Sequence, residues 1–114
     1  MLPDRLLPHS VTVLTPGSKT DRYGNTIPDW DAATSTTIRG RFELLLSDAV
    51  ALREKTVGRD DAVSTWRFYT NSPVNMRQRL TWDSRTFDVD GEVAKVYDAA
   101  NVHHYEALVR TSDG

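Results

Sequence analysis

Short segments in which apolar and polar residues alternate recur along the chain, and turn-forming residues separate them. Between residues 36 and 45, for example, every second residue from Ile38 to Leu44 is apolar or glycine, and the residues between them are charged. A period of two is the side-chain repeat of a β-strand with one buried face. The sequence therefore predicts strands at residues 9–15, 36–45, 62–70, 79–82, 85–89, 92–97 and 103–111.

This succession of short strands predicts an all-β protein, because β-branched and aromatic residues favour half-buried pleated surfaces. We expect a small β-barrel or sandwich of roughly six to seven strands, with long loops and one optional short helix. A chain of 114 residues has the length of one domain, so residues 1–114 are expected to form a single barrel domain.

The segments between the strands differ in length and character. Residues 17–34 are polar and show no clear period, so we expect a long loop there. Residues 47–61 fit a short helix capped by Ser47 or Asp48, or a second loop ended by Gly58. Two later turns are expected to be tight. Residues 83–84 form a two-residue connection, and residues 90–91 (Asp-Gly) predict a type I′ hairpin that pairs 92–97 back onto 85–89. Residues 98–102 are expected to form a loop.

Charge and composition narrow the classes of function. The formal net charge is −2, which disfavours a protein that works mainly by coating nucleic-acid phosphates. The chain contains no cysteine, which excludes disulfides, thiolate nucleophiles and cysteine-bound zinc. Its start lacks the apolar core of a signal peptide, and no apolar run approaches the roughly 18 residues of a membrane span. We expect a soluble protein made in the cytosol, with no membrane partner.

The carboxylates that occur in close pairs are better explained by turns and exposed strand faces than by catalysis. A catalytic dyad needs two carboxyl groups in one pocket, and the run from Asp88 to Glu92 lacks the spacing of a calcium loop. No nucleophile elbow or phosphate-binding glycine motif occurs. We therefore expect no enzymatic activity and no cofactor. The pairs are Asp29/Asp31, Asp60/Asp61 and Asp88/Asp90.

The adjacent residues His103 and His104 fall in the last predicted strand. Neighbouring side chains of a regular strand point to opposite faces, so the two imidazoles are not expected to chelate one ion. His9 is remote in the sequence. A metal site is therefore not expected.

Basic residues recur at the strand period, as Arg39/Arg41 and Arg77/Arg79. They would suit a single-strand-binding barrel if they formed a stripe beside aromatic side chains, but solvated strand faces and ion pairs explain them better. Trp30 stands in a polar setting, where it either fastens the 17–34 segment to the barrel or belongs to a partner interface.

Several segments, taken together, match a known pattern over nearly the whole chain. They are His9-Ser10-Val11-Thr12-Val13, Asp21-Arg22-Tyr23-Gly24-Asn25 followed by Trp30, Arg39-Gly40-Arg41-Phe42-Glu43, Arg79-Leu80-Thr81-Trp82-Asp83, Arg85-Thr86-Phe87-Asp88-Val89-Asp90-Gly91 and His103-His104-Tyr105-Glu106. In order and spacing the chain resembles the head-to-tail stopper (head-closure, head-tail joining) proteins of long-tailed bacteriophages.

The resemblance implies a structural virion protein in the phage neck, present in the host cytoplasm during assembly. Such proteins form a ring, commonly of twelve copies, with six as an alternative. The ring closes the DNA-filled head below the portal and its adaptor and offers a docking surface to the tail terminator or tail tube. Packaged double-stranded DNA lies nearby in the channel without sequence-specific binding.

Two sets of residues follow from this resemblance. An arm at 17–34 would contact partners through Tyr23, Asn25 and Trp30, and a loop at about 46–61 would face the channel. The channel candidates are Asp48, Arg53, Glu54, Lys55, Arg59 and Asp60. A tail-terminator or tail-completion protein is the first alternative, and an oligonucleotide-binding small β-barrel is the second.

Overall fold

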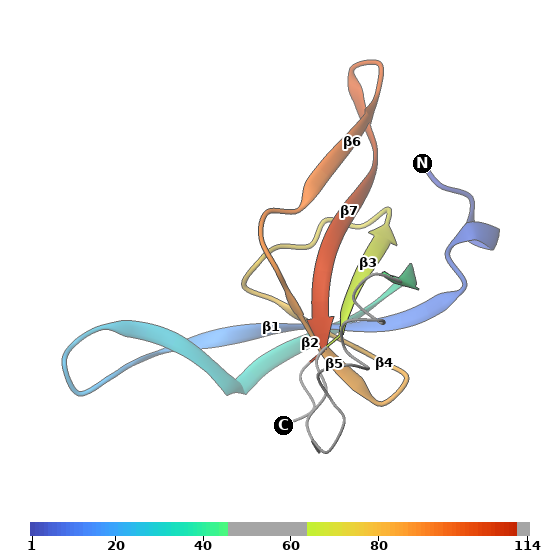
Figure 1. The fold of residues 1–114 in the computed structure, drawn as a ribbon. Coiled ribbons are helices and arrows are strands. Elements are labelled where there is room, and N and C mark those ends of the chain that lie inside the picture. Colours follow the sequence, from blue (N-terminus) through green and yellow to red (C-terminus); the bar gives the residue numbers. More distant parts are fainter. Residues whose placement is uncertain (46–63, 112–114) are drawn as a thin grey trace.

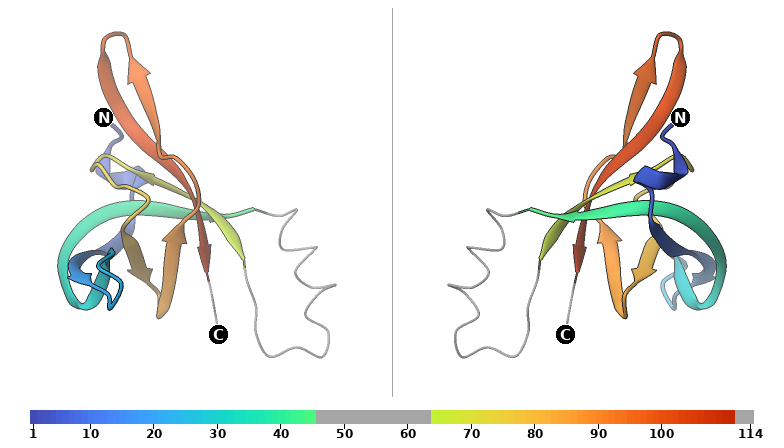
Figure 2. Two further views of the ribbon diagram at one scale, coloured as in Figure 1. Left: turned by 90° about the vertical axis from the view of Figure 1, so that its left-hand side faces the viewer. Right: turned by 90° about the vertical axis from the view of Figure 1, so that its right-hand side faces the viewer.

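The computed structural model describes residues 1–45 and 64–111. The described chain is almost entirely antiparallel β-structure (Figures 1 and 2). Its elements are a short 3-10 helix η1 (Asp4–Leu6) and strands β1 (His9–Thr20), β2 (Thr26–Leu44), β3 (Thr65–Thr70), β4 (Arg79–Trp82), β5 (Arg85–Val89), β6 (Ala94–Asp98) and β7 (Asn101–Thr111).

The seven strands belong to one sheet that closes on itself. Their order is β3-β2-β1-β4-β5-β7-β6, and β3 also pairs with β7. Closure through this last pairing makes a ring of β1, β2, β3, β4, β5 and β7, while β6 is attached only to the first half of β7. The prediction of a small all-β fold is confirmed. A closed ring also leaves few free strand edges.

The interior of the barrel is filled from alternate positions of its strands. Phe42 lies at the centre, with ring centroids 4.4 Å from Phe87, 4.7 Å from Phe68 and 4.9 Å from Trp82. The alternation predicted from residues 36–45 is confirmed, because Gly40 and Phe42 are buried between exposed charged neighbours. The buried apolar side chains are Leu7, Val11, Val13, Phe42, Phe68, Val74, Leu80, Phe87, Ala107 and Val109.

Residues 17–34 do not form the expected long loop. β1 continues to Thr20, the chain turns at residues 21–25, and β2 begins at Thr26, so this segment is a β-hairpin. The ladder breaks between Thr15, which faces Thr34, and Gly17, which faces Asp29. The strand predicted to end at residue 15 therefore continues, and Pro16 and Gly17 mark an irregularity within it.

The hairpin extends well beyond the barrel (Figure 1, blue and cyan, at the left). Beyond residue 15, β1 pairs in the described chain with β2 alone, since β4 covers only Thr12–Leu14. We call residues 17–29 the first arm. Its base is the register break, where residues 30–33 of β2 have no partner in the ladder.

The predicted pairing of 92–97 with β5 is also wrong. β6 pairs with β7 instead, and Asp90 donates its backbone N–H to the carbonyl of Leu108 at 2.8 Å, which leads the chain away from β5. The loop expected at 98–102 is a two-residue turn between Asp98 and Asn101. β6 and the first half of β7 therefore form a second arm, which points away in another direction (Figure 1, orange and red).

The predicted type I′ geometry occurs at a different place. Asp83 and Ser84, between β4 and β5, have φ values of 53° and 60°, as both central residues of such a turn require. The two-residue connection predicted there is confirmed. At the Asp-Gly pair, only Gly91 has a positive φ, of 89°. The helix or loop predicted for 47–61 lies outside the described residues, as does the start of the strand predicted at 62–70.

Candidate interaction surface

The tip of the first arm is a compact turn organised by one carboxylate. Oδ1 of Asp21 accepts hydrogen bonds from the backbone N–H groups of Tyr23 and Asn25, both at 2.9 Å. These bonds stabilise the charged form, led by the one from Asn25, and lower the pKa of Asp21. Gly24 completes the turn with a φ of 85°, a conformation that costs glycine little.

The turn presents Tyr23 to solvent. Tyr23 is 78% exposed, although it is a large aromatic residue, and the guanidinium of Arg22 lies 5.4 Å from its ring centroid in a cation–π contact. Exposed tyrosines are frequent anchors of protein interfaces. Asn25, the second candidate at this tip, uses its backbone N–H and its side-chain amide on Asp21, so it shapes the turn.

Trp30 lies at the base of the arm, in the unpaired stretch of β2. The guanidinium carbon of Arg79 in β4 is 3.9 Å from the centroid of the indole ring. Arg79 also donates from Nε to Asp88 of β5 at 3.1 Å. Trp30 therefore joins the arm to two strands of the barrel, which is the first of the two roles considered for it. The residue is half-buried, so part of its surface stays in contact with solvent.

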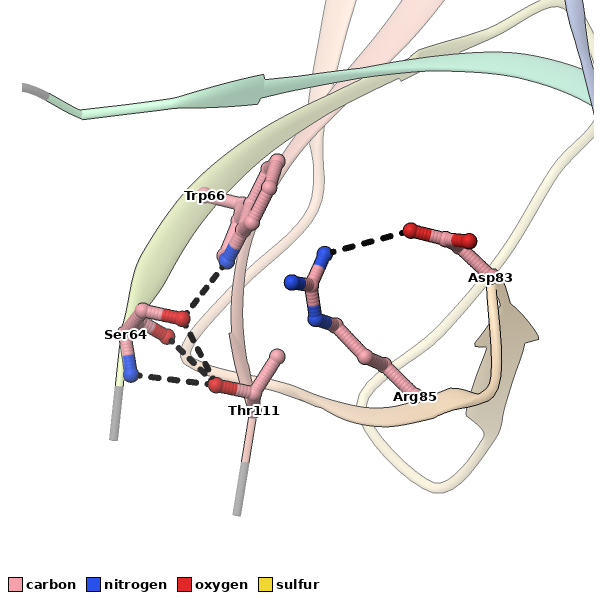
Figure 3. A network of polar contacts seen from close by, with 5 residues as sticks. All are labelled: Ser64, Trp66, Asp83, Arg85 and Thr111. Atoms are coloured by element: carbon pink, nitrogen blue, oxygen red, sulfur yellow. Dashed lines mark hydrogen bonds and ion pairs between the residues drawn. The ribbon is translucent and has the colours of Figure 1, made fainter. Parts of the chain in front are cut away.

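A polar network closes the barrel end from which residues 46–63 and 112–114 leave (Figure 3). The Thr111 hydroxyl accepts the backbone N–H of Ser64 at 3.0 Å and lies 2.7 Å from the Ser64 hydroxyl. The indole N–H of Trp66 donates to the same Ser64 hydroxyl at 2.7 Å. Arg85 stacks over Trp66, 5.4 Å from its ring, and pairs with Asp83 at 3.5 Å.

This network joins the start of β3 to the end of β7. It therefore fixes Ser64 and Thr111, the described residues next to 46–63 and 112–114 in the sequence. Sequence reasoning missed it, because Ser64 and Thr111 lie 47 positions apart and only the β3–β7 pairing brings them together. The channel candidates Asp48, Arg53, Glu54, Lys55, Arg59 and Asp60 all lie outside the described residues.

The second arm carries its own exposed apolar surface. Tyr97 on β6 is 59% exposed, and Val102 on β7 is also exposed. A shallow hollow along β6 is lined by Glu92, Val93, Ala94, Lys95 and Tyr97. No sequence signal indicated this surface, because residues 92–97 were expected to be covered by β5.

The two histidines of the second arm do not follow the alternation of side chains expected for a regular strand. Val96 pairs with His104 and Tyr97 with Val102, so His103 is an extra residue, a β-bulge, in β7. The bulge turns both imidazoles to the same side, and their Nδ1 atoms lie 2.8 Å apart. The expectation that they face opposite sides is therefore wrong.

A groove borders these histidines. It measures about 270 Å³ and is lined by Leu2, Leu6, Arg41, Glu43, Tyr69 and His104. The N-terminal segment forms one wall, held by two hydrogen bonds between the backbone of Leu2 and the side chain of Asn71 at 2.9 and 2.8 Å.

Several of the remaining candidates have local structural partners. Asp29 accepts the backbone N–H of Asp31, and Asp90 pairs with Arg110 at 3.4 Å. Arg39 donates to the backbone carbonyls of Leu7 and Asp4. Trp66 and Trp82 pack against the core. Arg39, Arg79, Trp66 and Trp82 are thus occupied by contacts within the described part of the protein.

Comparison with known proteins leaves the chain without an assigned family. No protein-family model matches it, and no curated protein is similar to it. Among the helices that the structure describes, none has the length and apolar character needed to cross a bilayer.

Proposed function

We propose that this protein is a head-to-tail stopper of a long-tailed bacteriophage. In this role it forms a ring in the virion neck, closes the filled head below the portal and adaptor, and offers a docking surface to the tail. The sequence resemblance supports the proposal. The observation that carries it is the first arm, which stands free of the barrel and presents Tyr23 at its tip.

A free hairpin is costly for an isolated monomer. Two paired strands with no third strand and no covered face have little stability of their own. The arm is nevertheless well defined at both ends, by the Asp21 carboxylate at the tip and the Trp30–Arg79 contact at the base. Such an element makes physical sense when a neighbouring subunit covers it after assembly.

Two arms that point in different directions suit a closed ring. Neighbouring copies in a ring meet through two different surfaces, which is a heterologous contact. The first arm and the second arm, with the exposed side chains of Tyr97 and Val102, offer two such surfaces. The partners in this proposal are copies of the same chain, the portal-side adaptor and the tail terminator or tube.

The arm can be tested in assembled particles by site-specific photocrosslinking. A photoreactive amino acid replaces Tyr23, and a second particle carries it at Thr86, an exposed position on β5 within the barrel. We expect ultraviolet light to join position 23 to a neighbouring copy or a neck protein in purified virions, and position 86 to give far less product. Virions that lack the protein, or no crosslink from position 23, would contradict the proposal.

A further inference from the structure

The side chains of His103, His104 and Glu106 form a connected chain on the second arm. Nδ1 of His103 lies 2.8 Å from Nδ1 of His104, and Nε2 of His104 lies 2.8 Å from a carboxylate oxygen of Glu106. The His104 side chain is only 11% exposed and that of Glu106 29%, so both are held by their surroundings. Two separate features of β7 bring them together. The bulge at His103 aligns the imidazoles, and the normal strand repeat places Glu106 on the same face as His104.

The partners of His104 determine which of its nitrogens is free. An ionised carboxylate only accepts hydrogen bonds, so Nε2 of His104 carries the proton and donates it to Glu106. In the neutral ring, Nδ1 then presents a lone pair toward His103. A metal-binding histidine is commonly held in this way, with the second ring nitrogen donating to a carboxylate.

We propose that His103 and His104 bind a divalent late transition-metal ion through their Nδ1 atoms, with Glu106 orienting His104. The ion would replace the hydrogen bond between the two rings, which would turn so that both Nδ1 lone pairs point at it. This site is independent of the proposed role in the phage neck.

The spacing of the nitrogens favours particular metals. Metal–nitrogen bonds of about 2.0–2.1 Å place two nitrogens roughly 2.9 Å apart at an angle of about 90°, and about 3.3 Å apart at a tetrahedral angle. The Nδ1–Nδ1 distance of 2.8 Å, which is that of a hydrogen bond here, needs the smaller change to reach the first value. Adjacent positions of a square-planar or octahedral ion have this angle, so Cu²⁺ and Ni²⁺ fit better than tetrahedral Zn²⁺.

The described residues supply two ligands to this site. In residues 1–45 and 64–111, no cluster of three histidine, aspartate, glutamate or cysteine side chains could hold a metal ion. Water or a group from a bound partner would fill the other positions. Arg41 lines the groove beside His104, and its positive charge repels an added cation. The carboxylates of Glu43 and Glu106 attract the cation and offset this repulsion.

The test is a titration of the full-length, tag-free protein with CuCl₂ and separately with NiCl₂, followed by calorimetry. Electron paramagnetic resonance of the copper form reports the bound nitrogens. The chain has three histidines, so the set His103→Gln, His104→Gln and His9→Gln covers all of them, with His9→Gln as the matched control. Far-UV circular dichroism and thermal unfolding establish that each variant is folded.

We expect one Cu²⁺ per chain, with nitrogen couplings from two imidazoles. Affinity should fall at least about tenfold in His103→Gln and His104→Gln, fall about tenfold in Glu106→Gln, and stay unchanged in His9→Gln. Equal binding by wild-type and His104→Gln would overturn the proposal, because the ion would then lie elsewhere. Failure of the wild-type protein to bind either ion would overturn it too.

Discussion

Trp30 in β2 and Arg79 in β4 are in stacking contact, with the guanidinium carbon 3.9 Å from the centroid of the indole ring. The contact lies at the register break between the barrel and the first arm, where residues 30–33 have no ladder partner. Where β2 has no backbone pairing with β1, this side-chain contact connects the base of the arm to the barrel.

Removing the indole should free the arm without unfolding the barrel. An exposed cation–π contact contributes about 0.5–1 kcal/mol, so Trp30→Ala should change the free energy of unfolding by about that amount. Amide hydrogen exchange at residues 17–29 should accelerate, and the subunit should bind neighbouring neck proteins more weakly. Trp30→Phe keeps a ring and is the control. Unchanged exchange and unchanged binding in Trp30→Ala would refute this role.

Gly40 is required by the packing of Phe68. A Cβ at position 40 would clash with Cε1 of the fully buried Phe68 ring. Overpacking of this kind costs about 1–3 kcal/mol, so Gly40→Ala should lower stability by that much in urea unfolding. The double variant Gly40→Ala/Phe68→Leu should lose less than the sum of the single changes. Additive losses would show that the two positions do not clash.

Stability should depend on pH through His9. Its Nδ1 accepts the backbone N–H of Phe42 at 3.1 Å, and its ring packs on Trp82 at 4.1 Å. Burial lowers the pKa of His9, with a further contribution from the nearby Arg41. The unfolded chain therefore binds this proton more readily than the folded one. The stabilisation is complete above the ordinary value of 6.5 and is lost as the pH falls through the lowered value.

The measurement for His9 is urea unfolding of wild-type protein and His9→Gln at pH 7.5 and at pH 5. The wild-type protein should lose part of its advantage over His9→Gln at the lower pH. An advantage that stays constant between the two conditions would show that His9 does not titrate differently in the folded and unfolded states.

The Asp21 carboxylate should govern the order of the arm tip. Asp21→Asn removes the charge that accepts two backbone N–H groups, so the amides of Tyr23 and Asn25 should lose protection from exchange. Asp31→Asn changes an exposed carboxylate outside the turn and is the matched control. In the wild-type protein, a carbon-13 NMR titration should give Asp21 a pKa below 3.8. A value at or above 3.8 would contradict the turn geometry.

The Thr111 hydroxyl should be needed for the network at the barrel end. Thr111→Val keeps the shape but leaves the backbone N–H and the hydroxyl of Ser64 without their partner. Such a loss costs about 1–3 kcal/mol, and thermal unfolding should show it. Thr86→Val makes the same chemical change at an exposed site and should have little effect. Equal stability of the two variants would rule out the network as a stabilising feature.

The strands of the barrel were predictable because each has one buried face, which imposes the alternation seen around Phe42. The first arm was not, because both faces of a free hairpin are exposed and leave no apolar period, whereas the two strands of the second arm were predicted and only their pairing was wrong. Pro16 and Gly17 look like a strand end in any local reading. The pairing of β6 with β7 was not predicted, because the hydrogen bond from Asp90 to Leu108 that accompanies it joins residues far apart in the sequence.

The candidate site shows the same division. The predicted partner contacts Tyr23, Asn25 and Trp30 all belong to the 17–34 segment. Tyr23 and Asn25 lie at the tip of the first arm, and Trp30 lies at its base. The alignment of His103 with His104 depends on a one-residue bulge, which no pattern in the sequence indicates.

Electron microscopy of lysates tests the central claim most directly. The gene for this protein is disrupted in a phage that carries it, and particles are compared with those of the complemented strain. The stopper role predicts finished tails separate from heads that filled and then leaked their DNA. Full heads beside free tails of irregular length would indicate a tail terminator instead. Normal infectious particles would contradict any connector role, and salt-sensitive binding of single-stranded DNA by the purified protein would then support the oligonucleotide-binding alternative.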